Sequence, residues 1–171
     1  GRPYVNVKTS FYSLIPSTIN TKIQKKLINY FLKKLEKKPY LHDKVEFEIL
    51  FTCYDFTLKK RMEDLINYGF TRTEIKIIKN QLIDFTNELI KKTPDILKQT
   101  VSFLKILEDK RKESRDKISG YKSKLSNAET LLKNCKKYGV VQFTAVARLA
   151  FIANILLKGL TEISNIKKLE I

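Results

Sequence analysis

Few residues of this sequence are suited to catalysis, and two of them are neighbours in the chain. A single histidine, His42, is followed directly by Asp43. Such a pair supports nucleophilic catalysis only when a nucleophile lies beside the imidazole in space, and no G-x-S-x-G elbow presents a serine. We therefore expect a surface or capping role for His42, and the sequence predicts no catalytic residue.

Three charged residues are candidates for a buried ion pair or an interface. Glu46 and Glu48 would share one face of a strand, where they could act as paired carboxylates, but they diverge on a helix. Arg148 stands among apolar helix positions, where an unpaired buried charge is strongly unfavourable. We predict that Arg148 pairs internally, with Glu46 or Glu48 as its partner. A bound anion or ligand is the alternative partner for Arg148.

The familiar cofactor and metal signatures are missing from the sequence. The nearest approach to a Walker A loop, Gly120-Tyr121-Lys122-Ser123, lacks the preceding glycines whose backbone amides wrap phosphate. The two cysteines, Cys53 and Cys135, show no paired spacing, which argues against a zinc site or a disulfide framework. We expect this segment to bind no cofactor and no metal, and two unpaired cysteines favour a reducing cytoplasm.

The charge of the chain is strongly positive. With 34 Lys and Arg against 18 Asp and Glu, the formal net charge is +16. An excess of this size is typical of proteins that bind nucleic acid or anionic membranes. Most of the basic residues are lysines scattered along the chain, so solvated helix faces explain the excess better than a phosphate-binding surface does. Nucleic-acid binding stays an alternative.

Composition and periodicity predict a mainly α fold for the whole chain, and the elements of its first half follow. Five glycines and four prolines are too few for a many-turned β fold. Residues 3–12 alternate in part and predict a short N-terminal β element, and residues 23–35 predict an amphipathic helix. Residues 43–56 fit a strand or a helix, with helix favoured. Residues 57–68 predict a further helix, for which Gly69 suits the C-terminal cap.

Two capping boxes predict where helices begin. Thr21 with Gln24 and Thr71 with Glu74 have the spacing at which the hydroxyl accepts a backbone N–H and the side chain three residues on reaches back. A helix over residues 75–90 is expected after the second box.

The later half of the sequence predicts a long antiparallel helix hairpin. Thr93-Pro94 suits a restart of the chain, with threonine as the cap and proline at the first helical position. Two helices, roughly 94–118 and 123–138, then meet near Gly120.

The most apolar segment, residues 139–160, follows the hairpin. Its length invites a membrane-spanning interpretation, but Gln142, Arg148 and Asn154 interrupt it every six residues, which is costly in lipid. We predict a buried apolar helix near the C-terminus of a soluble domain, and no membrane partner.

Several blocks of sequence resemble a known family. They are Gly1-Arg2-Pro3-Tyr4-Val5-Asn6-Val7, Ser10-Phe11, Ile15-Pro16, Leu41-His42-Asp43-Lys44-Val45-Glu46-Phe47-Glu48-Ile49, Phe51-Thr52-Cys53-Tyr54-Asp55, and the stretch from Phe143 to Ala153. These blocks resemble a region of bacterial phosphoenolpyruvate synthase-like proteins, which are related to pyruvate phosphate dikinases. They touch both ends of the chain, so the resemblance covers most of it.

The resemblance implies a central helical region between an ATP-grasp domain and a mobile phosphohistidine domain. ATP and Mg are then cofactors of the parent phosphotransferase and not of this segment, because the Thr-Ser-His loop and the ATP-grasp motifs are absent and His42 does not match that loop. Residues 1–171 are expected to form a single helical domain of a larger cytoplasmic protein, with the flanking domains of the parent chain as partners. A basic nucleic-acid-binding or protein-interaction module is the alternative.

Overall fold

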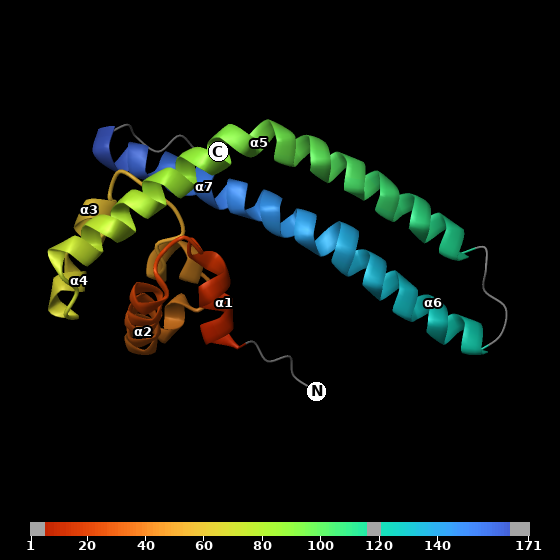
Figure 1. Cartoon of the computed structure of the whole chain (residues 1–171), viewed down its shortest axis with the longest axis horizontal. Helices are drawn as coiled ribbons and strands as arrows, with labels where there is room; N and C mark the ends of the chain where they lie inside the picture. The colour runs from red at the N-terminus through yellow and green to blue at the C-terminus, as the bar shows by residue number, and fades with distance from the viewer. Residues whose placement is uncertain (1–5, 116–120, 165–171) are drawn as a thin grey trace. The chain divides into compact units, whose positions relative to one another are not determined.

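The computed structural model describes residues 6–115 and 121–164, and within these ranges the chain is mainly helical and has no strand. This confirms the mainly α prediction. The chain divides into two compact units: unit 1 comprises Gly1–Leu89 with Phe151–Ile171, and unit 2 comprises Ile90–Ala150. Figure 1 labels the seven α-helices of the described residues, which are α1 (Val7–Leu14), α2 (Thr21–Lys37), α3 (Leu58–Arg61), α4 (Asp64–Asn67), α5 (Arg72–Arg115), α6 (Tyr121–Asn134) and α7 (Val141–Ser164).

A helix replaces the strand predicted for residues 3–12. Asn6 is the N-cap of α1, and its side-chain oxygen accepts the backbone N–H of Thr9 at 3.0 Å. This local bond favours a helical start, and α1 then buries Phe11 in the core. The alternation in the sequence was therefore misleading, and the first residues of the predicted strand lie outside the described part of the chain.

The amphipathic helix predicted over residues 23–35 is confirmed as α2, but its cap differs from the prediction. The cap is Asn20, whose side chain accepts the N–H of Lys22 at 2.8 Å, so the predicted box of Thr21 and Gln24 is wrong. The Gln24 side chain instead donates to the carbonyl of Pro16 at 3.2 Å. The buried residues of α2 are Ile23, Leu27, Ile28, Tyr30 and Phe31.

The second predicted capping box is confirmed at the start of α5. The N–H of Glu74 donates to the Thr71 hydroxyl at 3.1 Å, and the N–H of Thr71 donates to the Glu74 carboxylate at 2.8 Å. Gly69 follows α4 with a φ of +80°, the left-handed conformation expected of a C-terminal cap. The single helix predicted for residues 57–68 is instead two short ones, α3 and α4.

The core of unit 1 is built around Phe31, which is 0% exposed. The Phe31 ring forms T-shaped pairs with the rings of Phe11 and Phe51, with ring centroids 6.5 and 5.2 Å apart. Such pairs add to the stabilisation from burial. A second, smaller cluster joins Cys53 to Ile152 and Ile155, so the last part of α7 packs in unit 1.

Residues 43–56 form neither the favoured α-helix nor a strand. A π-helical turn, η2 (Val45–Ile49), follows the 3-10 turn η1 (Pro39–Leu41), and the residues after η2 are irregular although many are buried. Buried carbonyls need hydrogen-bond donors. The Arg61 guanidinium supplies them, because it donates to the carbonyls of Phe47 and Leu50 at 3.1 and 2.7 Å.

In unit 2 the predicted restart at Thr93-Pro94 is wrong, because α5 runs through it and Pro94 lies inside the helix. Proline has no N–H, so the helical bond from residue 94 to the carbonyl of Ile90 is not made. Ile90 is also the residue at which unit 2 begins.

Aromatic and polar contacts join α5 to the residues after Gly120 within unit 2. Phe103 lies 5.7 Å from Tyr138 between ring centroids, and the Asn127 amide donates to the Ser114 carbonyl at 3.0 Å. The segments approach closely at Gly139, where an added Cβ would lie 3.3 Å from a methyl group of Leu107. Residues 116–120, with the expected tip of the hairpin, lie outside the described residues.

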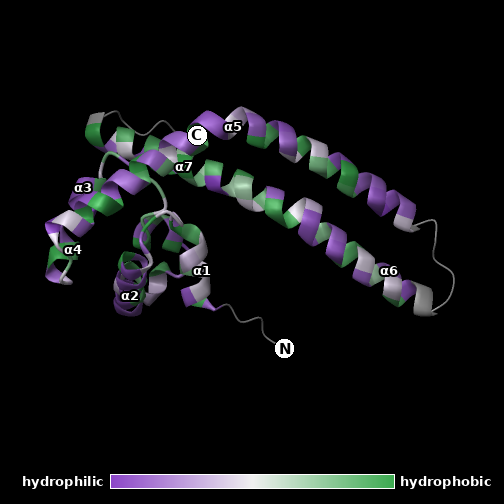
Figure 2. Cartoon of the chain, viewed as in Figure 1, coloured by the Kyte–Doolittle hydropathy of each residue, from purple (hydrophilic) through white to green (hydrophobic). Residues whose placement is uncertain are grey.

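The prediction that residues 139–160 form a buried helix is wrong. In α7 only Gln142, Ile152, Ile155 and Gly159 are buried, while Phe143 is 73% exposed. Apolar residues make up most of α7, with polar residues between them (Figure 2), and they mark no clear apolar face, so periodicity could not indicate how little of the helix packs against neighbours. The helical stretch Lys124–Ile163 is long and apolar enough to cross a membrane by length and composition alone, and 17% of its most apolar window is buried.

Candidate functional site

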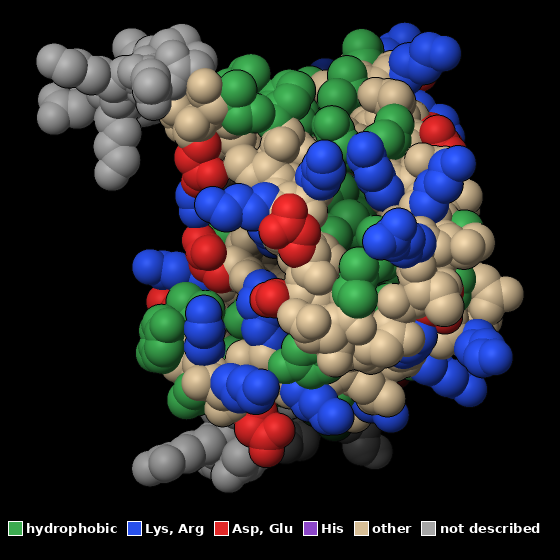
Figure 3. Space-filling view, turned by 90° about the vertical axis from the view of Figure 1, so that its left-hand side faces the viewer, with side chains coloured by type: hydrophobic (Ala, Val, Ile, Leu, Met, Phe, Trp, Pro, Cys, Tyr) green, Lys and Arg blue, Asp and Glu red, His purple; other side chains and the backbone are tan. Residues whose placement is uncertain are grey.

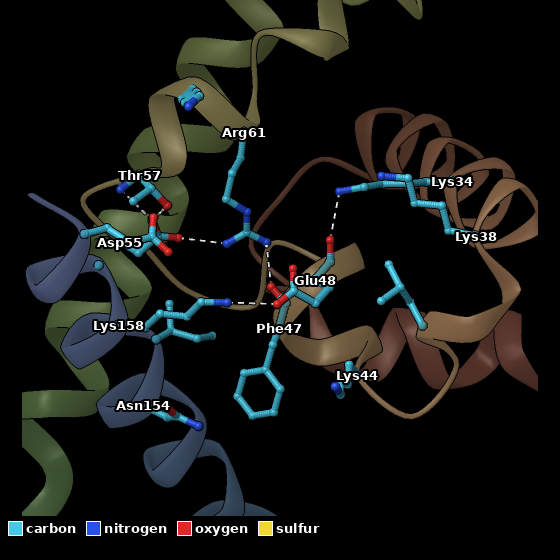
Figure 4. A pocket seen from close by; sticks show the side chains of 15 residues that line it. Lys34, Lys38, Lys44, Phe47, Glu48, Asp55, Thr57, Arg61, Asn154 and Lys158 are labelled. Atoms are coloured by element: carbon cyan, nitrogen blue, oxygen red, sulfur yellow. Dashed lines mark hydrogen bonds and ion pairs between the residues drawn. The ribbon is translucent and has the colours of Figure 1, made fainter. Parts of the chain in front are cut away.

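A cleft of about 670 Å³ lies in unit 1, among α2, η2, α3 and the last turns of α7 (Figure 4). Its volume falls within the range of small-molecule sites. Figure 4 shows Lys34 entering from α2, Lys38 from the C-cap of α2, and Lys158 and Asn154 from α7. The lining residues are Lys34, Lys38, Leu41, Lys44, Phe47, Glu48, Asp55, Thr57, Lys60, Arg61, Asn154, Ile155, Lys158, Gly159 and Glu162.

The most buried charge of the cleft is Asp55, which is 2% exposed. Its carboxylate accepts the N–H and the hydroxyl of Thr57 at 2.7 and 2.5 Å, and it accepts an Arg61 N–H at 2.9 Å. A buried carboxylate is stable only with such partners. Arg61 in turn lies over the ring of Phe51, 5.4 Å from its centroid. Asp55 and Arg61 therefore form a fixed node that holds the wall of the cleft.

Glu48 joins the two sides of the cleft. The Lys158 ammonium donates to its carboxylate at 2.8 Å, and the Lys34 ammonium donates to its backbone carbonyl at 2.9 Å. The hydrogen bond from Lys158 lowers the pKa of the Glu48 carboxyl, and the nearby charges of Lys158, Arg61 and Lys34 add to the effect.

The surroundings of Lys34 disfavour its charged form. It is half-buried, and the pKa of its ammonium is lowered mainly by burial and further by repulsion from Arg61 and Lys38. Its hydrogen bond goes to a neutral carbonyl and not to a carboxylate. Loss of hydration disfavours the charged form, so an anion near Lys34 would stabilise it.

The lining as a whole is basic, with six Lys or Arg residues against three Asp or Glu residues. Figure 3, which views the molecule from the left-hand side of Figure 1, shows Lys and Arg side chains spread over that face between apolar patches. A concave basic surface raises the local concentration of anions.

The predicted site residues fall in different places. Glu48 lines the cleft and is paired with Lys158. Glu46 contributes only a backbone carbonyl among the contacts found, which accepts the Thr52 hydroxyl at 3.2 Å. Arg148 belongs to unit 2, where it is half-buried and burial lowers the pKa of its guanidinium. Its pairing with Glu46 or Glu48 stays a prediction.

The exposed position expected of His42 is confirmed. Its ring nitrogen Nδ1 lies 3.1 Å from the carbonyl of Pro39, at the end of η1. His42 does not line the cleft.

Asp55, Arg61, Lys34 and Lys158 were not recognised in the sequence. The spacing of Asp55 and Thr57 is typical of a local side-chain-to-backbone turn and could have drawn attention to the aspartate. The pair of Lys158 and Glu48 joins residues 110 positions apart, so no local pattern could reveal it.

The residues that the structure describes include no group of three or more His, Cys, Asp or Glu side chains arranged to hold a metal ion. A scan against protein-family models matches none, and searches of the curated proteins and of the solved structures likewise find no match.

Proposed function

We propose that this chain is an accessory helical domain of a phosphoenolpyruvate synthase-like phosphotransferase. It positions flanking nucleotide-binding and phosphohistidine domains in the cytoplasm and does not catalyse the reaction alone. The supporting observation is that two of the blocks with family resemblance, residues 41–49 and 51–55, contact the same side chain and line the same cleft. The Arg61 guanidinium donates to the Phe47 carbonyl in the first block and to the Asp55 carboxylate in the second, and the two blocks supply five residues of the cleft lining.

The hydrogen bonds that Asp55 and Glu48 accept in the cleft support a positioning role for this domain. Asp55 accepts three hydrogen bonds, and Glu48 is held by Lys158. A general base needs a lone pair that is free to take a proton in the reaction. These carboxylates instead serve as acceptors that hold the fold of the cleft.

The proposal includes an antiparallel helix hairpin in unit 2. Contacts pair Thr100 with Gln142, Phe103 with Tyr138 and Ser114 with Asn127. The partner numbers fall as the numbers along α5 rise, which is the order of an antiparallel pair. A long pair of helices is suited to holding two domains apart.

Phosphorylation of the purified chain tests this proposal. Incubation with ATP labelled in the β or γ phosphate, Mg²⁺ and pyruvate should leave no label on the protein, because His42 is exposed on a short turn with no glycine-rich loop. An acid-labile label that disappears in the His42→Ala variant would overturn the proposal. The surrounding coding sequence is a second test, since a glycine-rich Thr-Ser-His loop downstream is expected.

A protein-interaction module is the second candidate function. Leu97, Val101 and Leu104 follow three-and-four spacing on α5, and each is about half exposed. An exposed apolar stripe of this spacing is typical of a helix that docks on a partner. Self-association in light scattering that is lost in Val101→Lys would favour this candidate, and clean monomeric behaviour would count against a partner formed by a second copy.

A further inference from the structure

The cleft of unit 1 carries positive charge that its own acids do not compensate. Its two innermost carboxylates, Asp55 and Glu48, are already paired, with Arg61 and Lys158. Lys38, Lys44 and Lys60 also line the cleft, and no ion pair found among the described residues includes them. Unpaired ammonium groups around a hollow attract a multivalent anion.

Two lysine side chains line the same part of the cleft. Lys34 lies in the last turn of α2 and Lys38 is the C-cap of that helix, where its backbone N–H donates to the Lys34 carbonyl at 3.2 Å. Figure 4 shows both at the same side of the cleft. Repulsion from Lys38 and from Arg61 lowers the pKa of Lys34, so the three cations are near enough to interact.

Arg61 fixes the wall of the cleft near these lysines. Its guanidinium makes hydrogen bonds to Asp55 and to the carbonyls of Phe47 and Leu50, which lock its position. Asp55 matches the charge of Arg61, so the uncompensated positive charge of the cleft comes from lysines such as Lys34 and Lys38.

The cleft also offers apolar surface beside the cations. Leu41, Phe47 and Ile155 are among its lining residues, and Phe47 is held edge-to-face against Phe151 with ring centroids 5.4 Å apart. Small-molecule sites combine apolar walls with a few charged groups that fix orientation. An anion that carries an organic group can contact both the lysines and the apolar lining, whereas an inorganic anion can contact only the lysines.

We propose that this cleft binds a small organic phosphate monoester, with Lys34 and Lys38 as the phosphate ligands and Phe47 beside the organic group. A phosphate dianion has enough oxygen atoms to accept from both ammonium groups, and charge-assisted bonds of this kind are strong. The inference rests on the contacts in unit 1 alone, so it holds whether or not the chain belongs to a phosphotransferase.

Calorimetric titration of the 171-residue chain with phenyl phosphate at low salt tests the proposal. We expect saturable binding with one site, and binding of inorganic phosphate about tenfold weaker because it lacks the apolar body. Lys34→Gln should weaken phenyl phosphate binding about tenfold or more by removing one charge-assisted bond. Thermal unfolding of the free variants shows whether a loss of binding reflects a loss of folding.

Lys33→Gln is the matched control, because Lys33 lies on the same helix, is exposed and does not line the cleft. It removes the same charge and should leave binding unchanged. Equal weakening by Lys33→Gln and Lys34→Gln would show diffuse attraction and overturn the proposal, as would the absence of phenyl phosphate binding at millimolar concentration.

The protonation of Lys34 gives a second readout. In the free chain burial lowers the pKa of this ammonium, so a bound phosphate should raise it. Carbon-13 chemical shifts of the lysine side chains follow this change, and Lys34→Gln assigns the signal. A titration curve for Lys34 that phenyl phosphate leaves unmoved would contradict the proposal. Stronger binding of a single-stranded oligonucleotide that phenyl phosphate does not displace would also contradict it.

Discussion

Unit 1 and unit 2 differ in what they bury. Every hydrophobic side chain that is fully buried among the described residues belongs to unit 1, where Phe31, Leu27 and Leu82 are wholly inaccessible. Among the described residues of unit 2 the two buried ones are polar, Ser114 and Gln142, at 8% and 6% exposure. Since burial of apolar surface is the main stabilising contribution in folding, the folding stability of the chain resides mainly in unit 1.

The difference follows from the elements each unit contains. Unit 1 has short helices and turns that approach one another from several directions, so α2 can be covered on its apolar side. In unit 2 the described residues are long helices, and a helix pair alone leaves much of each surface in solvent. The described residues of unit 2 therefore keep several apolar side chains exposed.

Removal of a core aromatic ring should have the largest effect. Phe31→Ala should lower the free energy of unfolding by about 3–5 kcal/mol, because Phe31 is fully buried and its cavity cannot refill. Phe143→Ala in unit 2 is the matched control and should change stability by less than about 0.5 kcal/mol. Urea unfolding followed by circular dichroism measures both. Equal losses would disprove the contrast between the units.

The next largest effect is expected at Arg61. Arg61→Ala should destabilise the chain by about 2–4 kcal/mol, because the buried Asp55 carboxylate loses its only paired cation and the carbonyls of Phe47 and Leu50 lose the donor that Arg61 supplies. Arg72→Ala removes an exposed arginine at the start of α5 and should be nearly neutral. Chemical unfolding distinguishes the two variants, and a neutral Arg61→Ala would show that the node does not hold the cleft wall.

In unit 2 a stabilising substitution is expected. Pro94→Ala restores an N–H inside α5 and removes the clash of the proline ring, so it should raise helix stability by about 1–3 kcal/mol. Gln99→Ala, at an exposed position of the same helix, should gain only a few tenths of a kcal/mol. Hydrogen exchange of residues around 90–98 measures the gain. Faster exchange in Pro94→Ala would mean that the proline is required at this boundary.

Sequence reasoning succeeded where a local rule decides the structure. The Thr71–Glu74 box, Gly69 and the amphipathic helix α2 were predicted because their signals lie within a few residues. It failed in α7, where the apolar residues mark no clear face, and in residues 43–56, where the distant Arg61 allows an irregular backbone.

The candidate site was predicted only in part. Glu48 was chosen for its charge, and it does line the cleft, but its partner Lys158 lies 110 residues further along the chain. Lys34 looks like any other lysine on a helix that has basic residues throughout. Its half-buried state depends on η2 and α3, which no spacing in α2 indicates.

A smaller effect is expected at the cap of α5. Thr71→Ala should destabilise unit 1 by about 1 kcal/mol, because the Glu74 N–H loses its acceptor. Thr73→Ala is the matched control within the same turn and should be neutral or slightly stabilising, because alanine is the better helix former. Thermal unfolding compares them, and equal midpoints would show that the box contributes nothing.

The smallest effect concerns the pH dependence of the same cap. Bonds from Lys26 and from the Thr71 N–H lower the pKa of the Glu74 carboxyl below its ordinary value of 4.5. Because the carboxylate is favoured in the folded state, its contribution is complete above that value and is lost as the pH falls through the lowered pKa.

Glu74→Gln should therefore be less stable than the unmodified chain at neutral pH by less than about 1 kcal/mol, and the difference should shrink in acid. Urea unfolding at pH 7 and at several lower pH values measures it. In a Lys26→Gln background the pH-dependent part should decrease, since the 2.7 Å ion pair is already gone. A difference that stays constant with pH would assign the role of Glu74 to its neutral hydrogen bond, and the charge would then play no part in holding α5 to unit 1.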